Sequence, residues 1–243
     1  MNIVLLLIAG VLPAIVLWLY IWRQDPQPEP TSWLLKAVWY GVAVCIPVAL
    51  VEGVIEAILF GEGGQPTTLF GTTVQAFFVA AVPEECAKLL ALWLLLRRNP
   101  WFDEHFDGIV YAVSVGLGFA ALENVSYLLS NIDDWYGMAV SRAFLAVPGH
   151  YAFAVLMGYY YSLWYFTGRT PRYAMLMLLV PVVAHGVYDA IALSGQVNQY
   201  VGAVSFIVLV FFCVKMHKHA RQKMLAHLKH DQEREGDDYV EIV

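Results

Sequence analysis

The chain contains seven long apolar stretches, each of which is long enough to cross a lipid bilayer. A membrane-spanning helix needs about 20 predominantly apolar residues, and hydrophobic residues make up 60% of this chain of 243 residues. Such stretches predict helices, because lipid offers no hydrogen-bond partner to an irregular backbone. The candidate spans are residues 2–22, 33–60, 72–97, 106–130, 139–167, 173–194 and 200–216. We therefore expect an all-α protein, a polytopic transmembrane helical bundle.

The basic residues between the spans predict the orientation of this bundle. Lysine and arginine cluster in the first, third and fifth loops and after the last span, whereas the second and sixth loops have none. Basic loops stay in the cytoplasm, so we expect the N-terminus outside and the C-terminus inside. The first span lacks a basic leader and an Ala-x-Ala cleavage site, which favours an uncleaved span over a signal peptide. The loop residues used for this assignment are Arg23, Lys36, Arg97, Arg98, Arg169 and Arg172.

The domain organisation follows from the same pattern. Residues 1–216 form an integral membrane domain, and residues 217–243 form a charged cytoplasmic tail that is first basic and then acidic. The acidic end of the tail has the composition of a disordered segment. We expect a multi-pass protein of a prokaryotic cell membrane, with the lipid bilayer as its surroundings and no nucleic acid as a partner.

Four of the predicted spans carry ionisable side chains, one of them beside an asparagine, and these side chains lie at similar depths. A charge at the bilayer centre costs roughly 2.5–3.5 kcal/mol, so several isolated charges are an improbable packing device. A helix rises about 1.5 Å per residue, so the distance of each residue from the end of its span gives its depth. All of these residues lie in the outer half of the membrane. We therefore expect one polar site buried among the helices. The residues are Glu84, Glu85 and Lys88 in the third span, Glu123 and Asn124 in the fourth, His150 in the fifth, and His185 and Asp189 in the sixth.

Helical spacing refines this site. His185 and Asp189 are four residues apart, as are Glu84 and Lys88, so each pair shares one helix face. The adjacent glutamates point about 100° apart, so one can line a cavity while the other pairs with the lysine. Glu52 and Glu56 are also four apart, near the outer end of their span. They either line an entrance or face headgroup water, and we favour the second alternative. Three small residues of the fourth span, Ala112, Gly116 and Ala120, predict close helix packing.

Glutamate, histidine and water in a cavity suit hydrolysis. A glutamate can act as general base on water, and a histidine can donate a hydrogen bond to a developing oxyanion. The same residues could hold zinc instead, through Glu84, His150 and His185, with one position open for water. The sequence has neither His-Glu-x-x-His nor Gly-x-Ser-x-Gly, so the usual helical zinc-peptidase and serine-nucleophile motifs are absent. Cys86 beside Glu85 is a less favoured nucleophile.

The order of these motifs resembles that of the PrsW family of intramembrane proteases, distant relatives of the type II CAAX prenyl endopeptidases. The resemblance extends over residues 75–195. It rests on Glu84-Glu85-Cys-Ala-Lys88, Phe106-Asp107-Gly108, Gly118-Phe-Ala-Ala-Leu-Glu123-Asn124, His150 and His185-Gly-Val-Tyr-Asp189.

The resemblance implies an intramembrane endopeptidase that cleaves a membrane-anchored, single-span protein of the anti-sigma-factor type near its extracytoplasmic side. It implies Glu84 as the water-activating base and Glu85 as its orienting partner, with His150 and His185 activating water or stabilising the oxyanion. Asp189 stands where the prenyl peptidases have an amide, so it orients His185 or is itself protonated. The catalytic set is then Glu84, Glu85, His150, His185, Glu123 and Asp189, supported by Lys88 and Asn124.

Other hypotheses remain open at this point. A site without a cofactor is the first choice, and zinc is the alternative on the same scaffold. A proton-coupled carrier or channel would need a water path to both faces of the membrane, whereas the ionisable groups cluster in one half. A scaffold that binds membrane proteins without cutting them is the last alternative.

Overall fold

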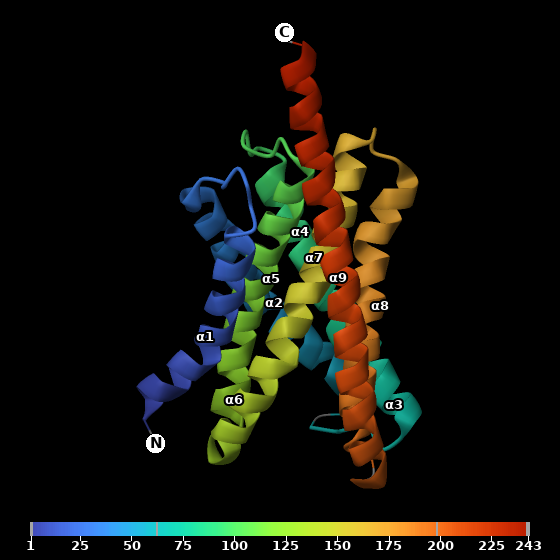
Figure 1. Cartoon of the computed structure of the whole chain (residues 1–243). Helices are drawn as coiled ribbons and strands as arrows, with labels where there is room; N and C mark the ends of the chain where they lie inside the picture. The colour runs from blue at the N-terminus through green and yellow to red at the C-terminus, as the bar shows by residue number, and fades with distance from the viewer. Residues whose placement is uncertain (1, 62, 198, 242–243) are drawn as a thin grey trace.

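The structure, a computed structural model, is built of helices that pack side by side (Figure 1). It describes residues 2–61, 63–197 and 199–241, and no β-strand occurs among them. The long helices are α1 (Ile3–Trp22), α2 (Thr31–Phe60), α5 (His105–Ser130), α7 (Ala146–Phe166), α8 (Pro171–Ser194) and α9 (Gln199–Glu241). The shorter helices are α3 (Leu69–Val74), η1 (Gln75–Ala81), α4 (Val82–Leu96), η2 (Ile132–Asp134) and α6 (Trp135–Phe144).

The centre of the bundle is α5, in which every residue from His105 to Ala120 is buried. It begins with a capping box, in which the side chains of Glu104 and Asp107 accept from each other's backbone N–H groups. Glycines on its surface let α2 and α7 approach closely, as expected for helices that pack in lipid. A Cβ at Gly116 would lie 2.8 Å from the Cβ of Ala154 on α7, so the small-residue stripe does form a packing face.

Six helical segments in the described part of the chain are long and apolar enough to span a membrane. Large apolar side chains such as Leu50 on α2 and Ile207 on α9 are exposed, as expected for a surface that faces lipid. The protein is therefore a multi-pass membrane protein. These six segments correspond to six of the predicted spans. The fourth segment, Ile132–Phe166, comprises η2, α6 and α7, with a break at Leu145.

The remaining predicted span, residues 72–97, is helical but does not form one regular helix. It is divided into α3, the π-helical segment η1 and α4. The π-helical segment ends at Ala81, two positions before Pro83, which has no N–H group to donate to the turn before it. Wide turns of this kind occur often at functional sites, and this one directly precedes Glu84 and Glu85.

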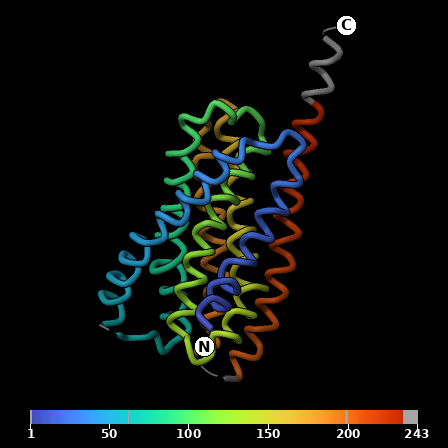
Figure 2. The backbone as a smooth tube through the Cα atoms, turned by 90° about the vertical axis from the view of Figure 1, so that its left-hand side faces the viewer, coloured from blue at the N-terminus to red at the C-terminus, as the bar shows by residue number. Residues whose placement is uncertain are grey.

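The loop between α1 and α2, the loop between α4 and α5, and the end of α9 lie at one end of the bundle, which we call the tail end (Figures 1 and 2). The N-terminus, α3 and the start of α9 lie at the opposite end, called the N-terminal end. The boundary expected between residues 216 and 217 is not marked by a break, because α9 continues through it to Glu241. The helix thus includes the acidic residues for which we expected disorder.

Candidate active site

The first turn of α4 places three charged side chains inside the bundle. Glu84 and Glu85 follow Pro83, and Lys88 lies one turn further along. All three are almost completely buried, with exposed fractions of 3%, 0% and 3%. Buried charges are stable only when they are paired and hydrogen-bonded, so their partners define the site.

The ammonium group of Lys88 lies at the centre of this cluster. Its Nζ atom is 2.8 Å from Glu84 Oε2, 2.9 Å from Glu85 Oε1 and 3.1 Å from His150 Nδ1. The ring of Phe119 covers it, with 4.3 Å between Nζ and the ring centroid. An ammonium has three hydrogens and no acceptor, so each hydrogen can serve one partner. His150 Nδ1 then accepts, and its proton resides on Nε2.

His150 connects this cluster to a second one at the far end of α5. Its Nε2 atom is 3.0 Å from Glu123 Oε2, which also accepts from Arg142 on α6 at 2.5 Å. The Arg142 Nε atom donates to Asn124 Oδ1 at 2.6 Å, and Asn124 donates to the carbonyl of Gly10 at 2.7 Å. The chain of bonds therefore holds His150 in one tautomer and one orientation.

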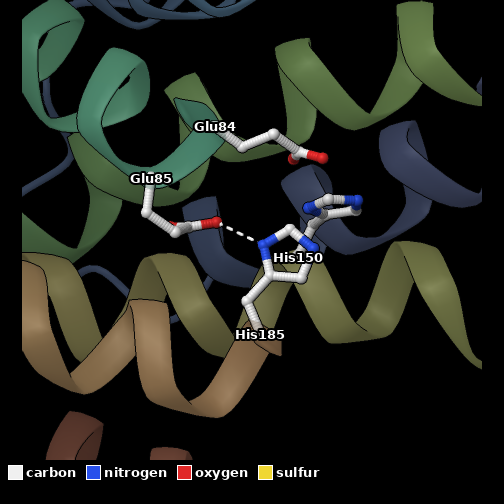
Figure 3. Close-up of side chains that lie close together, drawn as sticks. All are labelled: Glu84, Glu85, His150 and His185. Carbon is white, nitrogen blue, oxygen red and sulfur yellow. Dashed lines mark hydrogen bonds and ion pairs between the residues drawn. The ribbon is translucent and has the colours of Figure 1, made fainter. Parts of the chain in front are cut away.

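His185 on α8 lies between two carboxylates. Its Nδ1 atom is 2.9 Å from Glu85 Oε1, and its Nε2 atom is 3.2 Å from Asp189 Oδ2. Phe153 stacks on the imidazole, with ring centroids 4.7 Å apart. Figure 3 shows His150 and His185 on the same side of the two glutamates, with the bond from His185 to Glu85. A doubly protonated ring satisfies both carboxylates at once.

The structure thus brings together all the residues that the sequence assigned to the site. Glu84, Glu85, Lys88, Glu123, His150, His185 and Asp189 form one connected network, and Asn124 joins it through Arg142. Arg142 was not among the residues expected at the site, although it bonds to both Glu123 and Asn124. The available signal was its position inside the predicted span 139–167, where a cation needs a partner.

A cavity of about 520 Å³ lies beside the network. Glu84, Glu123, His150, His185 and Asp189 line it, whereas Glu85 and Lys88 are not among the residues of its wall. The two adjacent glutamates therefore differ as expected, because Glu84 meets the cavity and Glu85 lies behind it. The wall also includes Tyr127 near the end of α5, Ser141 on α6 and Gln196 after α8. The cavity therefore occupies the half of the bundle nearer the N-terminal end.

Glu52 and Glu56 also belong to the cavity wall, which agrees with the alternative of an entrance lining and not with the favoured alternative of a surface that faces headgroup water. Glu56 accepts hydrogen bonds from the amides of Gln65 and Gln75. Glu52 Oε1 is buried and has no hydrogen-bond partner among the described residues. Helical spacing alone could not distinguish a lipid-surface face from a cavity face for these two residues.

Comparison with known proteins decides the family. The model of the PrsW family, described as intramembrane metalloproteases, matches residues 29–216. The chain belongs to this family. It is 34% identical to Protease PrsW of Geobacillus kaustophilus over 218 residues, which cover 89% of this chain and 92% of the relative. It is 33% identical to Protease PrsW of Bacillus subtilis over 217 residues, covering 88% and 94%. No solved structure matches the chain.

The chain is therefore an intramembrane protease, and the description of its family as metalloproteases raises the question of a metal. Donor atoms of Glu84, Glu85, His150 and His185 lie within 4.8 Å of one another. Two imidazoles and two carboxylates are ligands that zinc accepts, so the residue types are suitable.

The arrangement of these donors, however, does not fit a metal ion. Lys88 Nζ occupies the space between three of the four groups, at hydrogen-bonding distances of 2.8–3.1 Å. A zinc ion would need ligands at about 2.0–2.2 Å in that space, and it would repel the ammonium. A metal can therefore enter only if Lys88 leaves or loses its proton, and no catalytic step below is derived through one.

Proposed function

We propose that this PrsW-family chain is a glutamate-dependent endopeptidase, in which Glu84 activates water for attack on a peptide bond within the membrane. The observation that carries the proposal is the position of Glu84, which borders the cavity while a buried lysine holds one of its oxygens. The bond to Lys88 uses Oε2, so Oε1 is left to accept a hydrogen bond from water. A carboxylate fixed in this way can take a proton from water as general base.

The remaining groups support the reaction around this base. As hydroxide attacks the carbonyl carbon, the carbonyl oxygen becomes negative and needs a donor. His185 meets the cavity and, when doubly protonated, can turn its Nε2–H from Asp189 towards that oxygen. The proton on Glu84 then passes to the leaving nitrogen, which releases one new carboxylate and one new amine. Glu85 and Lys88 act as positioning residues, because they lie behind the cavity wall.

The position of the cavity supports a particular class of substrate. It lies in the half of the bundle nearer the N-terminal end, which the basic loops assign to the outside of the cell. A segment cut there would belong to a membrane-anchored protein near its extracytoplasmic side. The substrate we propose is a single-span membrane protein of the anti-sigma-factor type.

The test is the substitution Glu84→Gln, which keeps the shape of the side chain and removes its basicity. We expect cleavage of a single-span substrate to fall by at least roughly 100-fold, the usual contribution of a general base. The readout compares ectodomains released from membranes of cells that carry either variant, which also identifies the substrate. Glu56→Gln is the matched control, since Glu56 lines the same cavity but bonds only to glutamine amides among the contacts described. Cleavage at the parental rate in Glu84→Gln would remove Glu84 from the mechanism.

A zinc-dependent mechanism on the same residues is the second candidate, favoured by the description of the family and by the four clustered donors. In this case Lys88 must move away, and zinc rather than the lysine would hold Glu84 and the histidines. Metal analysis of the purified protein, together with the sensitivity of cleavage to a chelator, separates the two candidates. Zinc-free protein that cleaves normally excludes the second one.

A further inference from the structure

The part of α9 that projects towards the tail end is fastened to the rest of the protein by specific contacts. His227 Nε2 bonds to the carbonyl of Tyr159 at 3.0 Å. The carboxylate of Asp231 accepts from the backbone N–H groups of His105 and Phe106, at 3.2 and 2.8 Å. Asp231 therefore provides acceptors for the first N–H groups of α5, which have no partner inside their own helix. The two helices are thus joined at the start of α5, at the tail end, whereas the cavity lies nearer the N-terminal end.

Two imidazoles meet the carboxylate at this junction. His105 Nδ1 and His230 Nδ1 each lie 3.3 Å from Asp231 Oδ1, and the contact of His230 is a hydrogen bond. The two imidazole rings are in contact, tilted by 55° to each other, with centroids 4.1 Å apart. One donor atom from each of the three residues lies within 4.8 Å of the others. The cluster therefore gathers nitrogen and oxygen donors around one small volume.

The His105 imidazole is the group that lacks an ordinary explanation. The residue is 6% exposed, and its Nδ1 atom is buried without a hydrogen-bond partner among the described residues. Its approach to Asp231 does not have the geometry of a hydrogen bond. A buried polar atom without a partner costs about 1–3 kcal/mol, so a missing ligand would relieve a real penalty.

We propose that His105, His230 and Asp231 form a second metal site, which binds a divalent transition metal such as zinc. Zinc bonds to imidazole nitrogen and carboxylate oxygen at about 2.0–2.2 Å, and tetrahedral geometry then places neighbouring ligand atoms about 3.3–3.6 Å apart. The two separations of 3.3 Å from Asp231 Oδ1 match this edge. Two imidazoles with one carboxylate favour zinc over magnesium or calcium, which prefer all-oxygen sites. The side chain of His230 is 52% exposed, so solvent can complete the coordination.

The charge around the site also favours a cation. Asp25, in the loop between α1 and α2, is buried, and its Oδ2 atom has no partner among the described residues. Burial is the main cause that raises the pKa of Asp25 to about 6, and the nearby charge of Asp231 raises it further. A metal bound to Asp231 would offset this repulsion. The bound metal would then stabilise the contact between α9 and α5 by the free energy of its binding.

The experiment compares the zinc content of three forms of the full-length, tag-free protein: wild type, His230→Ala and His219→Ala. His230 is half exposed, so its removal leaves the packing intact, and His219 is an exposed histidine on the same helix that serves as the control. We expect His230→Ala to hold about one zinc per chain less than the other two forms. The difference between forms is the readout, because zinc at the candidate active site would be present in all of them. Equal zinc content in all three forms overturns the proposal.

A second measurement follows the melting temperature in detergent with and without added zinc. Zinc should raise it more for wild type and His219→Ala than for His230→Ala and for His105→Gln. An equal rise in all four forms would count against the site. The melting temperature of Glu84→Gln should rise with zinc as much as that of wild type, because this variant changes the candidate active site and not the second metal site. Asp231 is not a suitable position for the test, because its substitution also removes the cap of α5.

Discussion

Lys88 is the residue on which the candidate active site depends most. It is the cation shared by Glu84, Glu85 and His150, and it is almost fully buried. Desolvating an ion costs several kcal/mol, which only close and well-formed partners offset. Lys88 therefore does within this site what a metal ion does in many hydrolases, since it brings carboxylates and an imidazole to one point.

We predict that Lys88→Met removes activity whether or not zinc is supplied, if the site works without metal. Two buried carboxylates would lose their cation, which should cost about 3–5 kcal/mol of stability, and Glu84 would lose its fixed orientation. The measurements are the cleavage rate and the melting temperature in detergent. Lys36→Met is the control, because Lys36 is exposed on α2 and lies over Trp33.

The zinc mechanism predicts a different result for the same variant. Without the competing ammonium, the four donors should bind zinc more tightly, and added zinc should restore cleavage. Recovery of the parental rate with zinc would therefore contradict the role we assign to Lys88 as the resident cation.

The site residues could be predicted from the sequence because each is an ionisable or amide side chain in an otherwise apolar stretch. Helical spacing also paired His185 with Asp189 correctly. The spacing predicted that Lys88 neutralises a single glutamate, whereas it contacts both glutamates and His150. Contacts between helices depend on their rotation and crossing, and no spacing along one helix contains that information.

At the scale of helices, α5 and α7 approach so closely that only glycine fits between them. A Cβ at Gly158 would lie 2.3 Å from the carbonyl oxygen of Gly108 and 2.7 Å from the Cα atom of Ile109. All these atoms belong to the backbone, so no side chain can rotate to make room. The pair matters for the site because α5 carries Glu123 and α7 carries His150, which are 3.0 Å apart.

We predict that Gly158→Ala lowers the free energy of unfolding by about 1–3 kcal/mol, the usual cost of overpacking a tight interface. The control is Gly53→Ala on α2, where an added Cβ would meet nothing within 4 Å. That change should be neutral or stabilising, because alanine is the better helix former. Melting in detergent measures both variants. Equal melting temperatures for the two would show that the helices can separate without cost.

The elements themselves were largely predictable, because apolar stretches of about 20 residues have few alternatives in lipid. The π-helical segment η1 was not, because it depends on how residues 75–81 pack against α8. The continuation of α9 beyond residue 216 was indicated by the spacing of its residues, although their charged composition favoured a disordered tail. Its buried residues Met216, Ala220, Met224, His227 and Asp231 recur every three or four positions, which is the pattern of a helix that packs along one face.

At the scale of the whole molecule, the two ends of the bundle carry different acidic groups. The cavity lies nearer the N-terminal end, whereas Asp25 and Glu29 are buried in the α1–α2 loop at the tail end. Tyr111 on α5 donates a hydrogen bond to Glu29, and Asp25 accepts from the backbone N–H of Gln27 at 3.0 Å. Burial outweighs these bonds and raises the pKa of Asp25 to about 6 and that of Glu29 to about 7.

These raised pKa values predict that the folded protein loses stability as the pH rises from about 4 to about 7. The folded state keeps protons on Asp25 and Glu29 that the unfolded chain, with ordinary values of 3.8 and 4.5, has already released. Stability falls with pH wherever the folded state binds more protons. Glu29→Gln removes one of these groups and should make stability depend less on pH. The melting temperature of the variant should therefore rise relative to that of wild type as the pH approaches 7. Melting temperatures in detergent between pH 5 and pH 8 measure this, with the exposed Glu233→Gln as the control. If the curves for wild type and Glu29→Gln ran parallel, Glu29 would release its proton at the same pH in the folded and unfolded states. That result would contradict the raised pKa of Glu29 in the folded protein.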